Sequence, residues 1–81
     1  MRCEVILFAH VREAVGKDRL VLDLPDGATV CDAIESLSAR HESVAAMRGR
    51  LAVAVNQRYA DSQSPLHEGD VLALIPPVSG G

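Results

Sequence analysis

The first nine residues alternate between apolar and mixed positions with the period of a β-strand. One set of alternate positions is apolar throughout and is expected to face the interior: Cys3, Val5 and Leu7. The other set contains Glu4, which marks the face that meets solvent and places Ile6 and Phe8 outward beside it. Residues 2–9 are therefore predicted to form a half-buried strand.

Turn-forming residues divide the next part of the chain. Residues 10–16 are largely polar and have room for a short helical turn. Residues 19–24 again have the pattern of a strand, which Pro25, Asp26 and Gly27 then break. The two strands are predicted to pair as a hairpin.

A main helix is predicted from its cap and from its apolar spacing. Thr29 supplies a side-chain oxygen for the unpaired amides of a helix start, and Asp32 places negative charge in the first turn. Apolar residues then recur at helical spacing: Val30, Ala33, Ile34 and Leu37. A second helical stretch over residues 43–48 ends at Gly49, which readily adopts the left-handed conformation that closes a helix.

Three further strand signals follow the helices. Alternating apolar residues predict a third strand: Leu51, Val53 and Val55. Tyr59 and Ala60 are expected to add a brief edge pairing, after which Leu66 returns to the core. Residues 71–75 are apolar throughout, as expected of a central strand that a helix covers on one face.

This order of elements predicts an α+β protein of the β-grasp type. The first and last strands can lie side by side in the middle of a mixed sheet of about four to five strands, packed on one main helix. We divide the chain into a β-grasp domain of residues 1–75 and an extended, flexible C-terminal tail of residues 76–81. A chain of 81 residues has room for a single core.

Charge and composition narrow the expected partners. The net charge is −3, Lys and Arg are scattered, and one Tyr and one Phe cannot form a base-stacking platform, so nucleic acid is not expected. No apolar run approaches the roughly 18 residues that span a bilayer, so we expect no membrane contact and a cytoplasmic location.

The three His residues are dispersed and predict no metal site. Cys3 and Cys31 are expected to be ordinary packed thiols, with sulfur handling by Cys31 near a helix start as the less favoured alternative.

The chain ends in six residues without strand character: Pro76, Pro77, Val78, Ser79, Gly80 and Gly81. Two successive prolines cannot donate the hydrogen bonds of a sheet and favour an extended conformation. At about 3.3 Å per residue this arm can reach roughly 20 Å, far enough to enter a partner's pocket. The terminal glycines leave the last peptide open to close approach. An incidental, frayed terminus is the alternative.

The terminal carboxylate of Gly81 is the group on which we expect chemistry. It is ionised at neutral pH and can attack the α-phosphate of ATP held by another protein, which gives an acyl adenylate. A persulfide can convert that intermediate to a thiocarboxylate, whereas a thiol or an amine would give a protein conjugate. The sequence offers no convincing set of nucleophile, base and oxyanion hole. Catalytic groups are therefore expected on partners, and the chain by itself is expected to be non-catalytic.

Several short motifs carry a resemblance that extends over nearly the whole chain. They are Leu7-Phe8-Ala9, Val11-Arg12-Glu13, Gly16, Val53-Ala54-Val55-Asn56-Gln57, Pro65-Leu66, Gly69-Asp70 and, most specifically, the six residues of the tail. In these motifs the sequence resembles the small subunits of molybdopterin synthase, which are sulfur carriers of the ubiquitin-like β-grasp family.

The resemblance implies a series of events at Gly81. An adenylyltransferase similar to ubiquitin-activating enzymes would adenylate it with ATP, and a sulfurtransferase would supply the sulfur of a thiocarboxylate. The tail would then enter the large subunit of the synthase, within a heterotetramer of small and large subunits. There the sulfur would be delivered to a cyclic pyranopterin monophosphate precursor to build the dithiolene of molybdopterin. No cofactor bound to the chain itself is implied.

The partner-binding surface is expected on the outer face of the sheet, next to the tail. Strand parity places Phe8 there, and Ile75 and Tyr59 are expected to join it, with tail residues 76–79 entering the partner. An exposed apolar patch of this kind usually marks an interface. Packing of Phe8 or Ile75 into the core is the alternative, because residues 71–75 do not alternate cleanly.

Other functions fit the same shape. A sulfur carrier for thiamine, cysteine or transfer-RNA thiolation would share the β-grasp body and the terminal Gly80-Gly81, and the two prolines before the tail favour the molybdopterin pathway over these. Two alternatives come from a different class: a protein modifier whose Gly81 forms isopeptide bonds, and a noncovalent adaptor.

Overall fold

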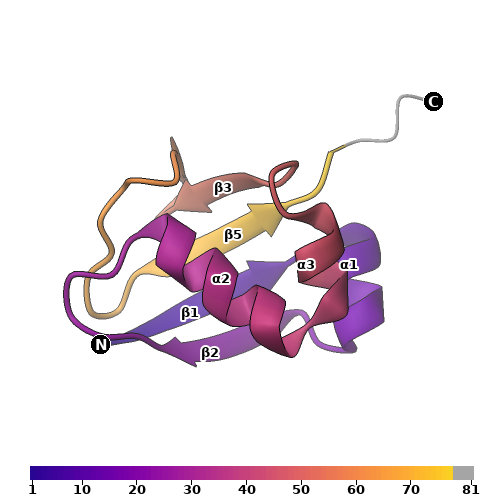
Figure 1. Cartoon of the computed structure of the whole chain (residues 1–81), viewed down its shortest axis with the longest axis horizontal. Coiled ribbons are helices and arrows are strands. Elements are labelled where there is room, and N and C mark those ends of the chain that lie inside the picture. Colours follow the sequence, from indigo (N-terminus) through magenta and orange to yellow (C-terminus); the bar gives the residue numbers. More distant parts are fainter. Residues whose placement is uncertain (78–81) are drawn as a thin grey trace.

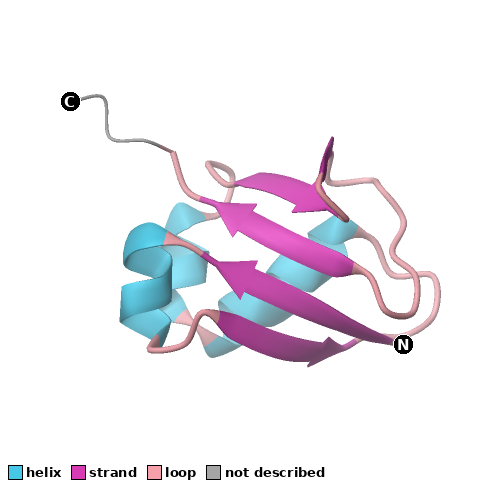
Figure 2. Cartoon of the chain, turned by 180° about the vertical axis from the view of Figure 1, so that it is seen from behind, coloured by secondary structure: helices cyan, strands magenta, loops and turns pink. Residues whose placement is uncertain are grey.

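The computed structural model describes residues 1–77, in which one mixed sheet carries helices on a single face (Figure 1). The strands are β1 (Arg2–Leu7), β2 (Arg19–Asp23), β3 (Ala52–Val55), β4 (Arg58–Ala60) and β5 (Val71–Ile75). The helices are α1 (Ala9–Val15), α2 (Val30–Arg40) and α3 (Glu42–Met47). The view from behind in Figure 2 shows the other face of the sheet without a covering helix. No helix described for residues 1–77 is long and apolar enough to cross a membrane.

The sheet has the strand order β2-β1-β5-β3-β4. Its two central strands, β1 and β5, run parallel and pair from Glu4 with Val71 to Leu7 with Leu74. The pairs β1 with β2, β3 with β5 and β3 with β4 are antiparallel. The predicted β-grasp arrangement and the predicted pairing of the first two strands are therefore confirmed, and α1 is inserted between those two strands.

The start of α2 is fixed by the predicted cap. The Thr29 hydroxyl oxygen accepts a hydrogen bond from the Asp32 amide at 3.4 Å, and the Asp32 carboxylate accepts one from the Thr29 amide at 2.9 Å. This reciprocal pair satisfies amides that a helix start otherwise leaves without partners. The capped helix presents three buried residues to the sheet: Val30, Ala33 and Leu37.

The core lies between the inner face of the sheet and the helices. Its fully buried side chains come from alternate positions of the strands and from all three helices: Cys3, Val5, Leu7, Val11, Leu22, Val30, Leu37, Val44, Leu72 and Leu74. Truncating a buried leucine such as Leu72 to alanine is expected to cost about 2–5 kcal/mol. Only alternate residues of β5 enter this core, because its second face belongs to the side of the sheet that no helix covers.

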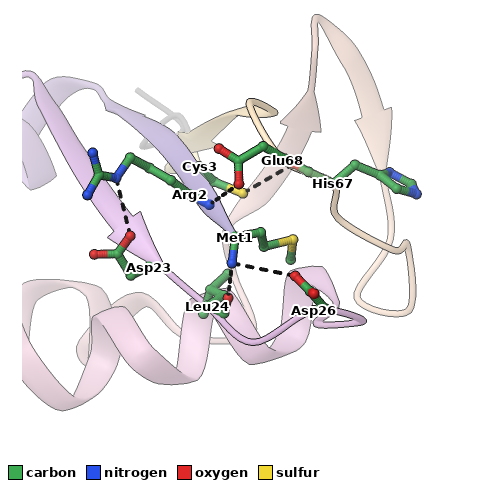
Figure 3. A network of polar contacts seen from close by, with 8 residues as sticks. All are labelled: Met1, Arg2, Cys3, Asp23, Leu24, Asp26, His67 and Glu68. Carbon is green, nitrogen blue, oxygen red and sulfur yellow. Dashed lines mark hydrogen bonds and ion pairs between the residues drawn. The ribbon is translucent and has the colours of Figure 1, made fainter.

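Polar contacts anchor the N-terminus beside the start of β1 (Figure 3). The Met1 ammonium donates to the Leu24 carbonyl at 2.6 Å, and the Arg2 amide donates to the Glu68 carboxylate at 2.9 Å. The Cys3 thiol donates to the His67 carbonyl at 3.6 Å. Burial, assisted by the nearby Asp70 carboxylate, raises the pKa of the Cys3 thiol. Cys3 is therefore a packed, protonated thiol at neutral pH.

Asn56 links the turn between β3 and β4 to the start of β5. Asn56 and Gln57 both have positive φ values, 51° and 70°, which a two-residue hairpin turn of this type requires. The Asn56 side-chain amide nitrogen donates to Asp70 Oδ1 at 2.9 Å, and its oxygen accepts from the Val71 amide at 3.0 Å. Asp70 Oδ2 also accepts from the His67 amide at 2.8 Å. The hydrogen bond from Asn56 is the main reason that the pKa of Asp70 lies below its ordinary value.

Replacing Asp70 with asparagine should make the stability of the protein less sensitive to acid. Because the pKa of Asp70 is lower in the folded than in the unfolded chain, its stabilisation is present above its ordinary pKa of 3.8 and is lost as the pH falls through the folded value. Asp70→Asn should unfold more easily at pH 7, by about 1–2 kcal/mol. Its stability should then fall less steeply than that of the parent between pH 5 and pH 2 in urea titrations.

Glu13→Gln is a matched control, because Glu13 is an exposed carboxylate on α1. This variant should change the stability at pH 7 less than Asp70→Asn does, because Glu13 makes none of the hydrogen bonds that Asp70 accepts. Parallel pH profiles for Asp70→Asn and the parent would show that Asp70 does not carry this linkage.

Candidate functional site

The parallel pairing of β1 with β5 brings two distant parts of the chain to the same edge of the sheet. The carboxyl ends of parallel strands lie together. The end of β1 continues into Phe8 and α1, and the end of β5 continues into Pro76 and Pro77. In Figures 1 and 2 the chain leaves β5 on the side where α1 also lies.

An apolar surface, here called the outer patch, covers this end of the bare face. Its residues are Ile6, Phe8, Ala73, Ile75 and Pro76. Phe8 is 42% exposed and borders two hollows, one shared with Ala73, Ile75 and Pro76 and one shared with Ile6. Phe8 and Ile75 therefore lie outside the core, on the face that strand parity predicts.

Phe8 is held by the turn that leads from β1 into α1. Phe8 itself is extended, with φ −131°, and Ala9 follows in the left-handed region with φ 52°. For a residue other than glycine this conformation costs roughly 1–2 kcal/mol. On one side the turn is fixed by buried Leu7, and on the other by Val11, which is fully buried on α1. A strained residue thus lies beside Phe8, between two rigid elements.

Pro76 belongs to the folded body by its burial, although the sequence assigns it to the tail. Pro76 is the buried member of the outer patch, where it lines the hollow beside Phe8, and Pro77 is the first exposed residue after β5. The pairing of β3 with β5 ends at Ala52 and Ile75, since a proline has no amide hydrogen to continue it. Four predicted site residues lie outside the described residues: Val78, Ser79, Gly80 and Gly81.

Tyr59 lies apart from the outer patch. It is 81% exposed on the edge strand β4, which is separated from β5 by β3. It borders a different hollow, between the start of α2 and the segment that precedes β3, with Cys31 and Ile34 among the other lining residues. The structure therefore brings Phe8, Ile75 and Pro76 together and places Tyr59 at the far edge of the sheet.

Two residues of the site gave little signal in the sequence. Ala9 and Ala73 line the hollow beside Phe8, and their small side chains leave the space that forms it. The uniform apolar character of residues 71–75 concealed which of them face outward. The register of β5 against β1, in which Ile6 pairs with Ala73, resolves this.

The surroundings of the outer patch are polar and charged. Arg19 and Glu4 form an ion pair across β2 and β1 and border the hollow that also contains Ile6. Within residues 1–77, no group of three or more His, Cys, Asp or Glu side chains is placed to hold a metal ion. The described part of the site thus presents an apolar surface next to the end of β5.

Comparison with known proteins places the chain in a family. The model of the ThiS family matches residues 5–81. The molybdopterin synthase sulfur carrier subunit of Arabidopsis thaliana is 35% identical over 78 residues, which cover 96% of this chain and 81% of the relative. The protein of the same name from Escherichia coli (strain K12) is 38% identical over 80 residues, with 96% of this chain and 98% of the relative covered.

Solved structures agree with the sequence relatives. SAMP1 from Haloferax volcanii, a small archaeal modifier protein, superimposes with a TM-score of 0.88 at 31% identity and full coverage of both chains. A chain in the complex of subunits 1 and 2 of the molybdopterin-converting factor from Helicobacter pylori 26695 superimposes with a TM-score of 0.72 at 26% identity, again with full coverage. With the fold, the outer patch and these matches together, the chain belongs to the ThiS family of ubiquitin-like β-grasp proteins, and it resembles the molybdopterin synthase sulfur carrier subunits along nearly its whole length.

Proposed function

We propose that this chain is the sulfur carrier subunit of a molybdopterin synthase. Its Gly81 is adenylated, converted to a thiocarboxylate and used to deliver sulfur to a cyclic pyranopterin monophosphate precursor. The observation that carries the proposal is the position of the outer patch at the root of a tail that ends in Gly80-Gly81. Support also comes from the relatives, which are named for this role.

The outer patch provides the docking contact in this proposal. A partner that covers Phe8 and Ile75 would meet the chain just before Pro77, so one binding event both holds the folded domain and directs the terminus. The residues from Pro77 to Gly81 can span at most about 17 Å, which sets the distance between the docking surface and the partner's reaction centre. The partner is the large subunit of the synthase, as suggested by the subunit pair of the Helicobacter pylori complex.

The chemistry begins with an attack of the Gly81 carboxylate on the α-phosphate of ATP held by an adenylyltransferase. Pyrophosphate leaves, and the glycine carries an acyl adenylate. A persulfide sulfur on a sulfurtransferase then attacks the acyl carbon and displaces AMP. A second thiol of that enzyme attacks the resulting acyl disulfide, which releases the thiocarboxylate and leaves a disulfide on the sulfur donor. The thiocarboxylate sulfur forms a bond to a carbon of the precursor, and water then cleaves the bond between that sulfur and the acyl carbon of Gly81. This hydrolysis leaves the sulfur on the precursor and returns a carboxylate to Gly81, so the carrier can be used again.

Protein modification is the second candidate, because the fold is also that of SAMP1. In that case the acyl adenylate would be transferred through a thiol to a lysine amine and give an isopeptide bond. High-molecular-weight conjugates that disappear when Gly80-Gly81 is deleted would favour this alternative. A precursor conversion that requires the same two residues would favour the sulfur carrier.

Intact-mass measurement should show that Gly81 accepts sulfur. After incubation with ATP, the matching adenylyltransferase and a sulfur source, the chain should gain the mass difference between sulfur and oxygen, located at Gly81 by fragmentation. A chain that lacks Gly81 is the control and should keep its mass. No gain in the presence of an adenylyltransferase that loads a known carrier would reject the proposed chemistry.

Replacing Phe8 with lysine should weaken binding to the large subunit. A charge at this position would be desolvated at the centre of an apolar contact, and loss of a central aromatic anchor typically costs more than about 1.4 kcal/mol, which is tenfold in affinity. Titration calorimetry measures the change, and the melting temperature checks the fold.

Ala45→Lys introduces the same charge as a control. Ala45 is exposed on α3, in the helical layer on the opposite side of the sheet from the outer patch. This variant should bind like the parent. Equal affinities of Phe8→Lys and Ala45→Lys would remove the outer patch from the docking surface.

A further inference from the structure

The edge strand β2 exposes the apolar side chain of Val21, which belongs neither to the core nor to the outer patch. Val21 lies at the middle of β2 and is 60% exposed. Within residues 1–77, β2 is paired on one side only, with β1. An exposed edge strand with an apolar centre is open to pairing with another strand, and proteins usually protect such edges.

The hydrogen-bond pattern shows which residues of β2 offer free backbone groups. Met1 and Leu24 exchange hydrogen bonds in both directions, at 2.6 and 2.8 Å, and the Leu7 amide donates to the Asp18 carbonyl at 2.9 Å. In an antiparallel ladder, hydrogen-bonded residues occur at every second position. Even-numbered residues of β2 therefore point their backbone groups toward β1. The remaining three point theirs away from the sheet: Arg19, Val21 and Asp23.

These three residues match the same three residues of a second, antiparallel copy of β2. A two-fold axis through Val21 would pair Val21 with Val21 of a second copy, and Arg19 with Asp23 of that copy in both directions. Each such pair exchanges two backbone hydrogen bonds, so the two strands would form roughly six. On the bare face of the sheet the two valines would touch, and each arginine would lie opposite an aspartate.

We infer that β2 is a homodimerisation edge, at which a second copy of this chain adds antiparallel and centred on Val21, so that the two sheets become continuous. The charges extend this complementarity. Arg19 already pairs with Glu4, and Asp23 with Arg2 at 3.3 Å, as Figure 3 shows for the latter pair. All of these side chains are more than a third exposed, so a second opposite charge can join each pair.

A second copy fits this edge better than an unrelated peptide does, because the complementarity depends on opposite charges at equal distances from the central valine. A register shifted by two residues would place Val21 opposite a charged residue and break the match. The other edge strand, β4, has only three residues, Arg58, Tyr59 and Ala60, and lacks this symmetry. The hollow of the outer patch that lies between Phe8 and Ile75 contains no residue of β2, so the dimer edge does not line it.

The dimer is expected to be weak. Contact along one strand buries less than the roughly 1,200 Å² typical of stable interfaces. A dissociation constant of roughly 0.1–1 mM is therefore expected. The inference does not depend on the sulfur carrier function, and its test uses the chain alone.

Nuclear magnetic resonance and sedimentation velocity on the purified chain test the dimer and its register. Between roughly 10 µM and 1 mM, which brackets the expected constant, the sedimentation coefficient should rise. Over the same range the amide signals of Arg19, Val21 and Asp23 should shift and their hydrogen exchange should slow. The amides of Leu20 and Leu22 should be nearly unchanged, because they already bond to β1. A chain that stays monomeric over this range would overturn the inference.

Charge exchange tests the partner residues directly. Arg19→Asp should weaken association at least tenfold, because it places like charges opposite each other, and the double variant Arg19→Asp/Asp23→Arg should restore it. Val21→Lys should also weaken association, whereas Tyr59→Lys on the opposite edge should not. A double variant as weak as Arg19→Asp, or association lost with Tyr59→Lys and kept with Val21→Lys, would contradict the proposed edge.

Discussion

The parallel pairing of β1 with β5 at the centre of the sheet is the constraint on which the rest of the structure depends. These strands join residues about seventy positions apart, and their inner faces carry side chains that are fully buried: Val5, Leu7, Leu72 and Leu74. A one-residue slip would move all of them from the core to the bare face of the sheet. The same register places Phe8 next to Ile75 and Pro76, so core packing also fixes the outer patch at the end of β5.

The single helical layer explains why an apolar surface remains exposed. Helices cover one face of the sheet, and the residues of β5 that point to the other face are Val71, Ala73 and Ile75. Polar residues at these three positions would make the protein more soluble, but the exposed face would then no longer be apolar. The strain at Ala9 belongs to the same arrangement, since the sharp turn after Phe8 keeps that side chain on the bare face while Val11 enters the core.

Local patterns predicted most of the fold. The parity of β1, the capping box of α2 and the left-handed Gly49 each depend on neighbouring residues, and each is found as expected. The failures concern contacts between distant residues. Tyr59 was expected near Phe8, but its position follows from the two-residue turn at Asn56 and from the order of β3 and β4, which the sequence does not display. The burial of Pro76 likewise depends on the space between two strands and could not be derived from its own neighbours.

Polar and apolar interactions occupy opposite ends of the central strand pair. The start of β1 and the start of β5 are held by the Met1 ammonium, the Glu68 carboxylate and the Asn56–Asp70 hydrogen bond. The opposite ends carry Phe8 and Ile75, where the Phe8 carbonyl accepts a hydrogen bond from the Arg12 amide and the exposed side chains form the apolar outer patch. Protonation of Asp70 at the polar end can therefore lower the stability of the folded domain without changing the charge of the outer patch. The outer patch can therefore be covered or exposed without breaking any of the polar contacts that hold the start of β1 and the start of β5.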